Sequence, residues 1–219
     1  MHKLTSLIAA ASLLAGASAF AQGGGNDKAS KPAQPAVKQP AKTTDKAVKL
    51  AVGDKAPALK VEKFIKGEEI TGFEKGHVYV IEFWATWCPP CQKSIPHLTD
   101  LQKEYKDKNL TIIGVDVAED RNGKYDASTL AAVEKFVKDK GDKMNYTVAY
   151  DGGAKAMDNA YMKAGGQNGI PAAFIVDGEG KIAWIGNPLD DNFKTQIKKV
   201  VGGKEKKKDK DAETAKKGG

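Results

Sequence analysis

Cysteine is scarce in this chain of 219 residues, which contains only Cys88 and Cys91. Histidine is nearly as rare, since His2, His77 and His97 are the only three. A structural zinc site takes four ligands, usually two Cys pairs or a Cys pair with a spaced His pair, and these histidines fit no such spacing. A disulfide that mainly stabilises a fold closes a long loop, whereas this pair closes almost none. Metal binding and structural cross-linking therefore explain the cysteines poorly, and we expect no metal.

The middle of the chain also has no long apolar run. It has no large excess of positive or negative charge either. Beyond residue 21 no segment approaches the ~20 apolar residues that a membrane-spanning helix needs. The formal net charge is +7, but residues 51–201 hold 21 basic and 22 acidic side chains, a net of −1 with His neutral. The basic excess thus belongs to the two ends. A neutral middle lacks the basic face of a nucleic-acid-binding domain, so we expect no nucleic-acid partner.

The N-terminus has the pattern of an export signal. Lys3 precedes an apolar stretch, and small residues end in Ala19-Phe20-Ala21. We expect residues 1–21 to be a signal peptide and the mature protein to be soluble in the periplasm or another extracytoplasmic compartment. An uncleaved N-terminal anchor is the alternative, although the apolar part is short.

Two further segments lack the large apolar side chains that a folded core requires. Residues 22–50 are rich in Lys, Ala and Pro and predict a disordered linker. Residues 202–219 predict a disordered Lys-rich tail. The folded part is then one domain, residues 51–201.

The two cysteines stand in Trp84-Ala85-Thr86-Trp87-Cys88-Pro89-Pro90-Cys91, directly after an apolar run. At a strand-to-helix junction the first sulfur lies at a helix N-terminus, where unpaired N–H groups and the helix dipole favour the thiolate. The thiolate is the species that attacks a disulfide. Because disulfides persist outside the cytoplasm, the spacing predicts a redox-active disulfide between Cys88 and Cys91.

Strand and amphipathic-helix patterns alternate along the domain, which predicts an α/β fold with helices packed on a sheet. The predicted strands cover residues 77–83, 110–117, 146–150, 172–176 and 182–185. The predicted helices cover residues 91–106, 129–140, a short stretch around 154–161, and 193–201. Ser128 is the expected N-cap of the second helix and Gly141 its end. Pro96 is expected to kink the first helix.

With these elements in place, the chain resembles the thioredoxin fold. More narrowly, it is similar to the exported thiol-disulfide oxidoreductases of the TlpA/ResA group. The resemblance rests on Phe83-Trp84-Ala85-Thr86-Trp87-Cys88-Pro89-Pro90-Cys91 and on Gly169-Ile170-Pro171-Ala172-Ala173-Phe174-Ile175-Val176-Asp177. It implies a central mixed β-sheet flanked by helices, with an N-terminal extension and a β-α insertion. It also implies an enzyme that needs no cofactor beyond its redox-active disulfide.

The resemblance assigns roles to four residues. Cys88 is the attacking thiolate that forms a mixed disulfide with a partner protein, and Cys91 is the less exposed resolving thiol. Pro171 corresponds to the family's cis-proline, which faces the sulfurs, and the Ile170 backbone pairs with the partner's chain as an added strand. An ordinary turn proline is the alternative for Pro171.

Glu82 is the one charged side chain in the apolar run before the cysteines. Burial in a strand raises the pKa of a carboxylate, which suits Glu82 to accept the Cys91 proton when Cys91 attacks the mixed disulfide. The matching position in cytoplasmic thioredoxins is an Asp with this role. A purely structural ion pair with a nearby Lys is the alternative.

Pro89 and Pro90 lack N–H groups and so remove two donors that could stabilise a Cys88 thiolate. Because a stabilised thiolate makes an oxidant, we expect a reductase rather than an oxidant. Trp87 is expected to shield the pair and, with the two prolines, to contact the partner. Two departures from the ResA-like pattern are Ser94, where those proteins often have a Glu, and Ala172-Ala173 after the proline. We expect neither to change the sulfur chemistry.

Several other functions are compatible with parts of the pattern. An oxidant or isomerase of the same fold differs only in redox potential. A peroxiredoxin expects a Pro and then a Thr or Ser three residues before the Cys, where Ala85 stands. A copper carrier needs a downstream His, and none follows His97. A non-catalytic envelope protein is the last alternative.

The expected partners follow from the resemblance. They are protein disulfides as substrates and a membrane-embedded thiol carrier as electron donor, and we expect a monomer. Cytochrome c maturation, repair of exported thiols and rescue of misoxidised proteins all fit.

Overall fold

The computed structural model describes residues 49–120 and 125–203. The strands are β1 (Lys63–Lys66), β2 (Val78–Trp84), β3 (Leu110–Asp116), β4 (Thr147–Tyr150), β5 (Ala172–Val176) and β6 (Ile182–Gly186). The helices are α1 (Pro89–Tyr105), α2 (Ala127–Lys140), the 3-10 turn η1 (Gly141–Met144) and the π-helical η2 (Asp158–Lys163). Residues 193–203 are also helical. The expected signal peptide, most of the linker and nearly all of the Lys-rich tail lie outside the described residues.

One mixed six-stranded sheet forms the centre, in the order β1-β4-β3-β2-β5-β6. Strands β2, β3 and β4 are parallel to one another, whereas β5 is antiparallel to β2, β6 to β5 and β1 to β4. All seven residues of β2 are buried, as expected of a central strand that is covered on both faces. The mixed sheet confirms the expected fold class.

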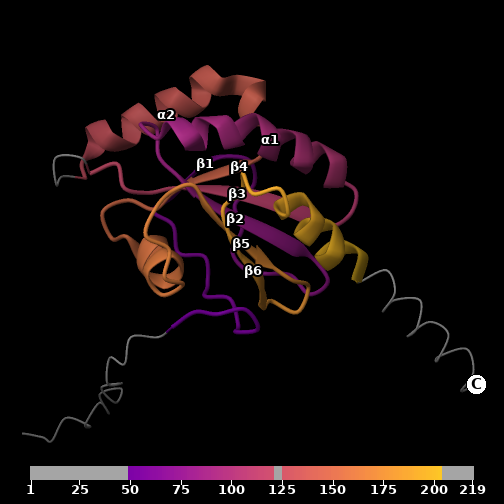
Figure 1. Cartoon of the computed structure of the whole chain (residues 1–219). Helices are drawn as coiled ribbons and strands as arrows, with labels where there is room; N and C mark the ends of the chain where they lie inside the picture. The colour runs from indigo at the N-terminus through magenta and orange to yellow at the C-terminus, as the bar shows by residue number, and fades with distance from the viewer. Residues whose placement is uncertain (1–48, 121–124, 204–219) are drawn as a thin grey trace, which may run out of the picture. The chain divides into compact units, whose positions relative to one another are not determined.

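The alternation of side chains along β2 divides the core in two. Tyr79, Ile81 and Phe83 pack on one face with Tyr161 of η2 and with Phe174. Val78, Val80 and Trp84 pack on the opposite face with α1, α2 and the C-terminal helix. Figure 1 shows α1 and α2 lying together over one side of the sheet. Because Glu82 alternates with Ile81 and Phe83, its side chain points to the α1 face.

Several elements differ from the predictions in their boundaries or were not predicted at all. Helix α1 begins at Pro89 rather than Cys91, because a proline has no N–H to lose in the first helical turn. Ser128 was the wrong N-cap of α2: Asp126 caps it, and its carboxylate accepts from the N–H groups of Ser128 and Thr129 in a capping box. Strand β1 was not predicted, because its exposed and half-buried side chains do not alternate clearly.

The folded part also extends slightly beyond its expected limits. Leu50, placed in the linker by its neighbours' composition, is buried and its N–H donates to the Ala164 carbonyl. At the other end the helix continues to residue 203. Gly141 ends α2 as predicted. Helix α1 runs on through Pro96, and the bend expected there stays a prediction.

Candidate active site

Cys88 is the N-cap of α1 and is joined to Cys91 by a disulfide. Pro89 and Pro90 occupy the first two helical positions and carry no N–H. The Cys91 N–H is therefore the first helical donor, and it points at the Cys88 sulfur with an N–Sγ distance of 3.2 Å. The helix N-terminus thus offers the Cys88 sulfur one backbone donor where three would otherwise be available.

The surface around the disulfide is graded from exposed to buried. Pro89 and Pro90 are exposed and Trp87 is half-buried, so these three form the outer rim. Cys88 is 2% exposed and Cys91 is fully buried behind it. An incoming group therefore reaches Cys88 before Cys91, as an attacking and a resolving thiol require.

The segment before β5 lies across from the disulfide. The peptide bond between Ile170 and Pro171 is cis, the conformation that the resemblance implied. The Ile170 carbonyl oxygen lies 3.8 Å from the Cys88 sulfur. Antiparallel pairing of Ala172 with Phe83 in β2 holds this segment beside the loop that leads into Cys88. The roles of Ile170 and Pro171 towards a partner stay predictions.

Glu82 is fully buried beneath the α1 face of the sheet. Burial raises the pKa of its carboxyl to about 8, and a hydrogen bond from Ser94 lowers it in part. The Ser94 Oγ donates to Glu82 Oε1 over 3.1 Å, while Glu82 Oε2 has no hydrogen-bond partner among the described residues. The salt bridges between described residues do not include Glu82, which speaks against the structural Lys pair.

Other buried polar groups gather around Gly114, the residue of β3 that pairs with Glu82. A Cβ at this glycine would lie 2.9 Å from Tyr146 Cε2 and 3.2 Å from Trp84 Nε1, so no larger residue fits. The Trp84 Nε1 and the Tyr146 hydroxyl both lack partners within the described part of the chain. Burial raises the pKa of Tyr146 well above its ordinary value, and the charge of Glu82 adds to this effect.

A second carboxylate, which the sequence analysis did not single out, holds the loop before Cys88. Glu119 accepts from the Thr86 N–H through Oε1 and from the Thr86 hydroxyl through Oε2. The Trp87 indole N–H donates to the Ala118 carbonyl over 3.0 Å. Ala118 has a φ of 58°, in the left-handed region that non-glycine residues seldom adopt. Glu119 reaches this loop because β2 and β3 pair in parallel, and the carboxyl ends of adjacent parallel strands share one edge.

Asp116, at the end of β3, is buried next to this loop. Its pKa is raised well above the ordinary value by burial and then by the charge of Glu119. Asp151 lies close by and accepts from the N–H groups of Met157 and Asp158. No group of His, Cys, Asp and Glu side chains in residues 49–120 and 125–203 is arranged to hold a metal ion.

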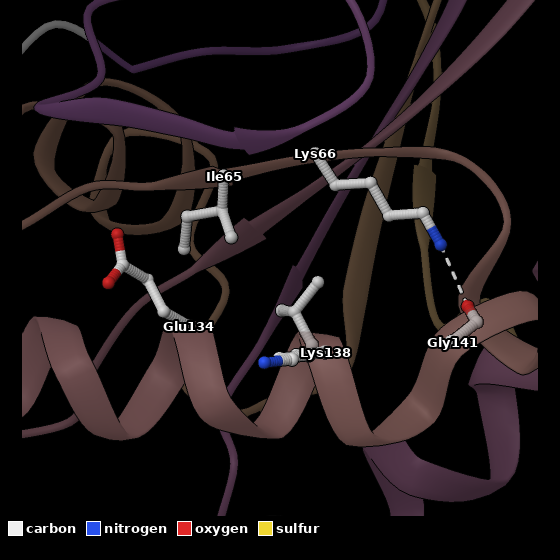
Figure 2. A pocket seen from close by; sticks show the side chains of 6 residues that line it. Ile65, Lys66, Glu134, Lys138 and Gly141 are labelled. Atoms are coloured by element: carbon white, nitrogen blue, oxygen red, sulfur yellow. Dashed lines mark hydrogen bonds between the residues drawn. The ribbon is translucent and has the colours of Figure 1, made fainter.

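A hollow lies between β1 and α2, and its lining includes neither cysteine (Figure 2). Lys66 extends along it, and its Nζ donates to the carbonyls of Gly141 and Met144, each over 2.7 Å. These contacts place a positive charge at the C-terminal end of α2, where it is favourable. Lys66 in this hollow therefore has a structural role at the end of α2.

Comparisons with known proteins agree with this site. The Redoxin family model matches residues 51–201. The chain belongs to the redoxin family. The thiol-disulfide oxidoreductase ResA of Bacillus anthracis is 30% identical over 156 residues, which cover 70% of this chain and 80% of ResA. Protein FixW of Rhizobium leguminosarum is 30% identical over 138 residues, or 63% of this chain, and the match spans 61% of FixW's length.

A solved structure has a similar fold. The thioredoxin domain of a thiol-disulfide oxidoreductase from Bacteroides vulgatus is 29% identical, with a TM-score of 0.53. The match covers 69% of this chain and 99% of that domain. Family, fold and the Cys88–Cys91 disulfide together make this redoxin a thiol-disulfide oxidoreductase. None of its described helices is both long and apolar enough to cross a bilayer.

Proposed function

We propose that this redoxin is an extracytoplasmic reductase of protein disulfides. The observation that carries the proposal is the Cys88–Cys91 disulfide at the N-terminus of α1, with the Ile170 carbonyl 3.8 Å from the Cys88 sulfur. The pair cycles between dithiol and disulfide, so no further cofactor enters the reaction.

The reaction transfers two electrons from the dithiol to a partner disulfide. The Cys88 thiolate attacks one sulfur of the partner, forms a mixed disulfide, and releases the partner's other sulfur as a thiolate that takes a proton from water. The Cys91 thiolate then attacks the Cys88 sulfur. The Cys88–Cys91 bond forms, the bond to the partner breaks, and the partner leaves as a dithiol.

The two prolines favour reduction over oxidation. An oxidant of this fold has a strongly stabilised thiolate, with a potential near −120 mV in DsbA against about −270 mV in thioredoxin. Here the Cys91 N–H is the one donor of the first helical turn that reaches the Cys88 sulfur. A less stabilised Cys88 thiolate favours the disulfide form and therefore a lower, more reducing potential.

Glu82 is proposed to accept the Cys91 proton during resolution. The carboxyl has a pKa of about 8, because it is buried, so near neutral pH it can both take up and release a proton. Glu82→Gln should therefore slow resolution of the mixed disulfide near neutral pH. A resolution rate equal to that of the unchanged protein would remove Glu82 from the mechanism.

The partner is proposed to dock on the rim described above. Trp87, Pro89 and Pro90 present apolar surface around Cys88. The Ile170 backbone lies just before the paired residues of β5, and an extended peptide is proposed to pair with it as an added strand. This mode recognises main chain more than side chains, which suits an enzyme acting on several protein disulfides.

The location and the electron source rest on the N-terminal export pattern. A reductase outside the cytoplasm receives its electrons across a membrane, so we propose a membrane-embedded thiol carrier as the donor. Candidate processes are cytochrome c maturation and the repair of other exported thiols.

Two experiments test this function. Insulin reduction driven by dithiothreitol should proceed with the unchanged protein and stop with Cys88→Ser. Cys91→Ser should accumulate mixed disulfides with extracytoplasmic proteins in cells, because resolution is blocked. If Cys88→Ser still catalyses insulin reduction, or Cys91→Ser traps nothing while being present in that compartment, the proposal is wrong.

A further inference from the structure

Ser94 is the single hydrogen-bond partner of Glu82 among the described residues. It lies on α1 three residues after Cys91 and is fully buried. Its Oγ is 3.1 Å from Glu82 Oε1 and 2.8 Å from the Cys91 carbonyl oxygen. From its place in the sequence, Ser94 was expected to leave the sulfur chemistry unchanged. The geometry connects it both to the proposed proton acceptor and to the backbone of the resolving cysteine.

A hydroxyl group has one hydrogen, so Ser94 cannot donate to both neighbours at once. The Cys91 carbonyl is always an acceptor. Glu82 is an acceptor when ionised, whereas its neutral carboxyl group can donate its own hydrogen to Ser94 Oγ. The protonation state of Glu82 therefore determines which neighbour receives the Ser94 hydrogen.

The residues paired with Glu82 on the neighbouring strands offer no side chain that hydrogen-bonds to its carboxyl in place of Ser94. On β3 the paired residue is Gly114, which has no side chain, and burial raises the pKa of Asp116 beyond it well above its ordinary value. Ala173 of β5 pairs on the other side. Tyr146, before β4, is a titratable group whose pKa the charge of Glu82 helps to raise, and its hydroxyl has no partner within the described residues.

We propose that Ser94 is a positioning residue that favours the ionised form of Glu82 by turning its hydroxyl hydrogen from the Cys91 carbonyl to Glu82 Oε1. This inference rests on the proposed role of Glu82 as proton acceptor. In the resolving step the proton of the Cys91 thiol passes to the Glu82 carboxylate, and the Cys91 thiolate attacks the Cys88 sulfur. The Cys88–Cys91 bond forms, the bond from Cys88 to the partner breaks, and the partner's sulfur leaves as a thiolate that takes a proton from water. Glu82, now neutral, donates to Ser94 Oγ, and the Ser94 hydrogen returns to the Cys91 carbonyl.

The first test measures Glu82 itself, independently of catalysis. Carbon-13 NMR follows the titration of the Glu82 carboxyl carbon in the oxidised protein, with Ser94→Ala beside it. Loss of a hydrogen bond to an ionised group should raise the midpoint by about one pH unit. Thr99→Ala, which removes another hydroxyl from α1 that bonds to the Lys143 carbonyl, should leave it unmoved. An unmoved midpoint in Ser94→Ala overturns the inference.

The second test connects the bond to resolution. Rates of mixed-disulfide resolution are measured from pH 5.5 to 9.5 for the unchanged protein, Ser94→Ala, Glu82→Gln and the double variant. Ser94→Ala should resolve about tenfold more slowly at pH 7 and approach the unchanged protein at high pH. The double variant should match Glu82→Gln alone. An equal loss at every pH, or a further loss in the double variant, contradicts the positioning role and indicates a packing role instead.

The two failures are distinguishable. If the NMR midpoint moves but Glu82→Gln resolves like the unchanged protein, the proposed function of Glu82 fails while the bond to Ser94 stands. Circular dichroism of Ser94→Ala checks that α1 is intact, which is expected because alanine is a strong helix former.

Discussion

Glu82 is a carboxyl group in a place where water cannot reach it, and its protonation state is therefore coupled to folding. In the folded chain its pKa is raised from 4.5 to about 8, mainly because burial disfavours the charged form. Between these two values the folded state binds more protons at Glu82 than the unfolded state does. Stability contributed by the neutral group is then fully present below about pH 4.5 and is lost as the pH rises towards 8.

Glu82→Gln should remove this pH dependence. The difference in unfolding free energy between the variant and the unchanged protein should grow in favour of the variant from pH 5 to pH 9, to at most about 5 kcal/mol. Urea unfolding of the oxidised proteins at a series of pH values measures it. Parallel stability curves over this range would show that Glu82 is not the titrating group.

At the scale of elements, the loop before α1 depends on the loop after β3. Three hydrogen bonds join them through side chains: two from Thr86 to Glu119, and one from the Trp87 indole to Ala118. The backbone adds a fourth, from the Val117 N–H to the Trp84 carbonyl. These contacts hold the loop that leads into Cys88 against the loop that follows β3, the parallel neighbour of β2.

Glu119→Gln should weaken this connection, because an amide offers one acceptor oxygen where the carboxylate offered two. We expect unfolding to become easier by about 1–2 kcal/mol and insulin reduction to slow. The matched control is Glu134→Gln, which breaks an exposed ion pair with Lys63 and should cost less than about 1 kcal/mol. Equal effects of the two variants on stability and activity would contradict a role for Glu119 at the site.

Local sequence patterns predicted those features that depend on a single helix or strand. The burial of β2 and the amphipathic α1 follow from side-chain periodicity, and their positions were predicted to within two residues. Asp126 was missed as a cap because it and Ser128 are both good capping residues, and the choice depends on where the chain enters the helix. Contacts between distant segments, such as Thr86 with Glu119, depend on strand order, which a single sequence does not specify.

At the scale of the whole molecule, the fold brings three segments to the same place. Strand β2 carries Glu82, helix α1 with its N-cap carries the cysteines and Ser94, and the segment before β5 carries Pro171. The cysteines and Pro171 were recognisable from their motifs, and Glu82 from its unusual place in an apolar strand. Ser94 gains its meaning only from the packing of α1 on β2, since no local pattern places a helical serine against a strand carboxylate.

The direction of electron flow is a property of this whole assembly, because it reflects every interaction of the Cys88 thiolate and of the disulfide. The redox potential of the Cys88–Cys91 couple, measured by equilibration with dithiothreitol and glutathione buffers, tests it most directly. Because the Cys88 thiolate has one helical N–H donor, we expect a value nearer to about −270 mV than to −120 mV. A potential above roughly −160 mV would contradict it and identify the protein as an oxidant.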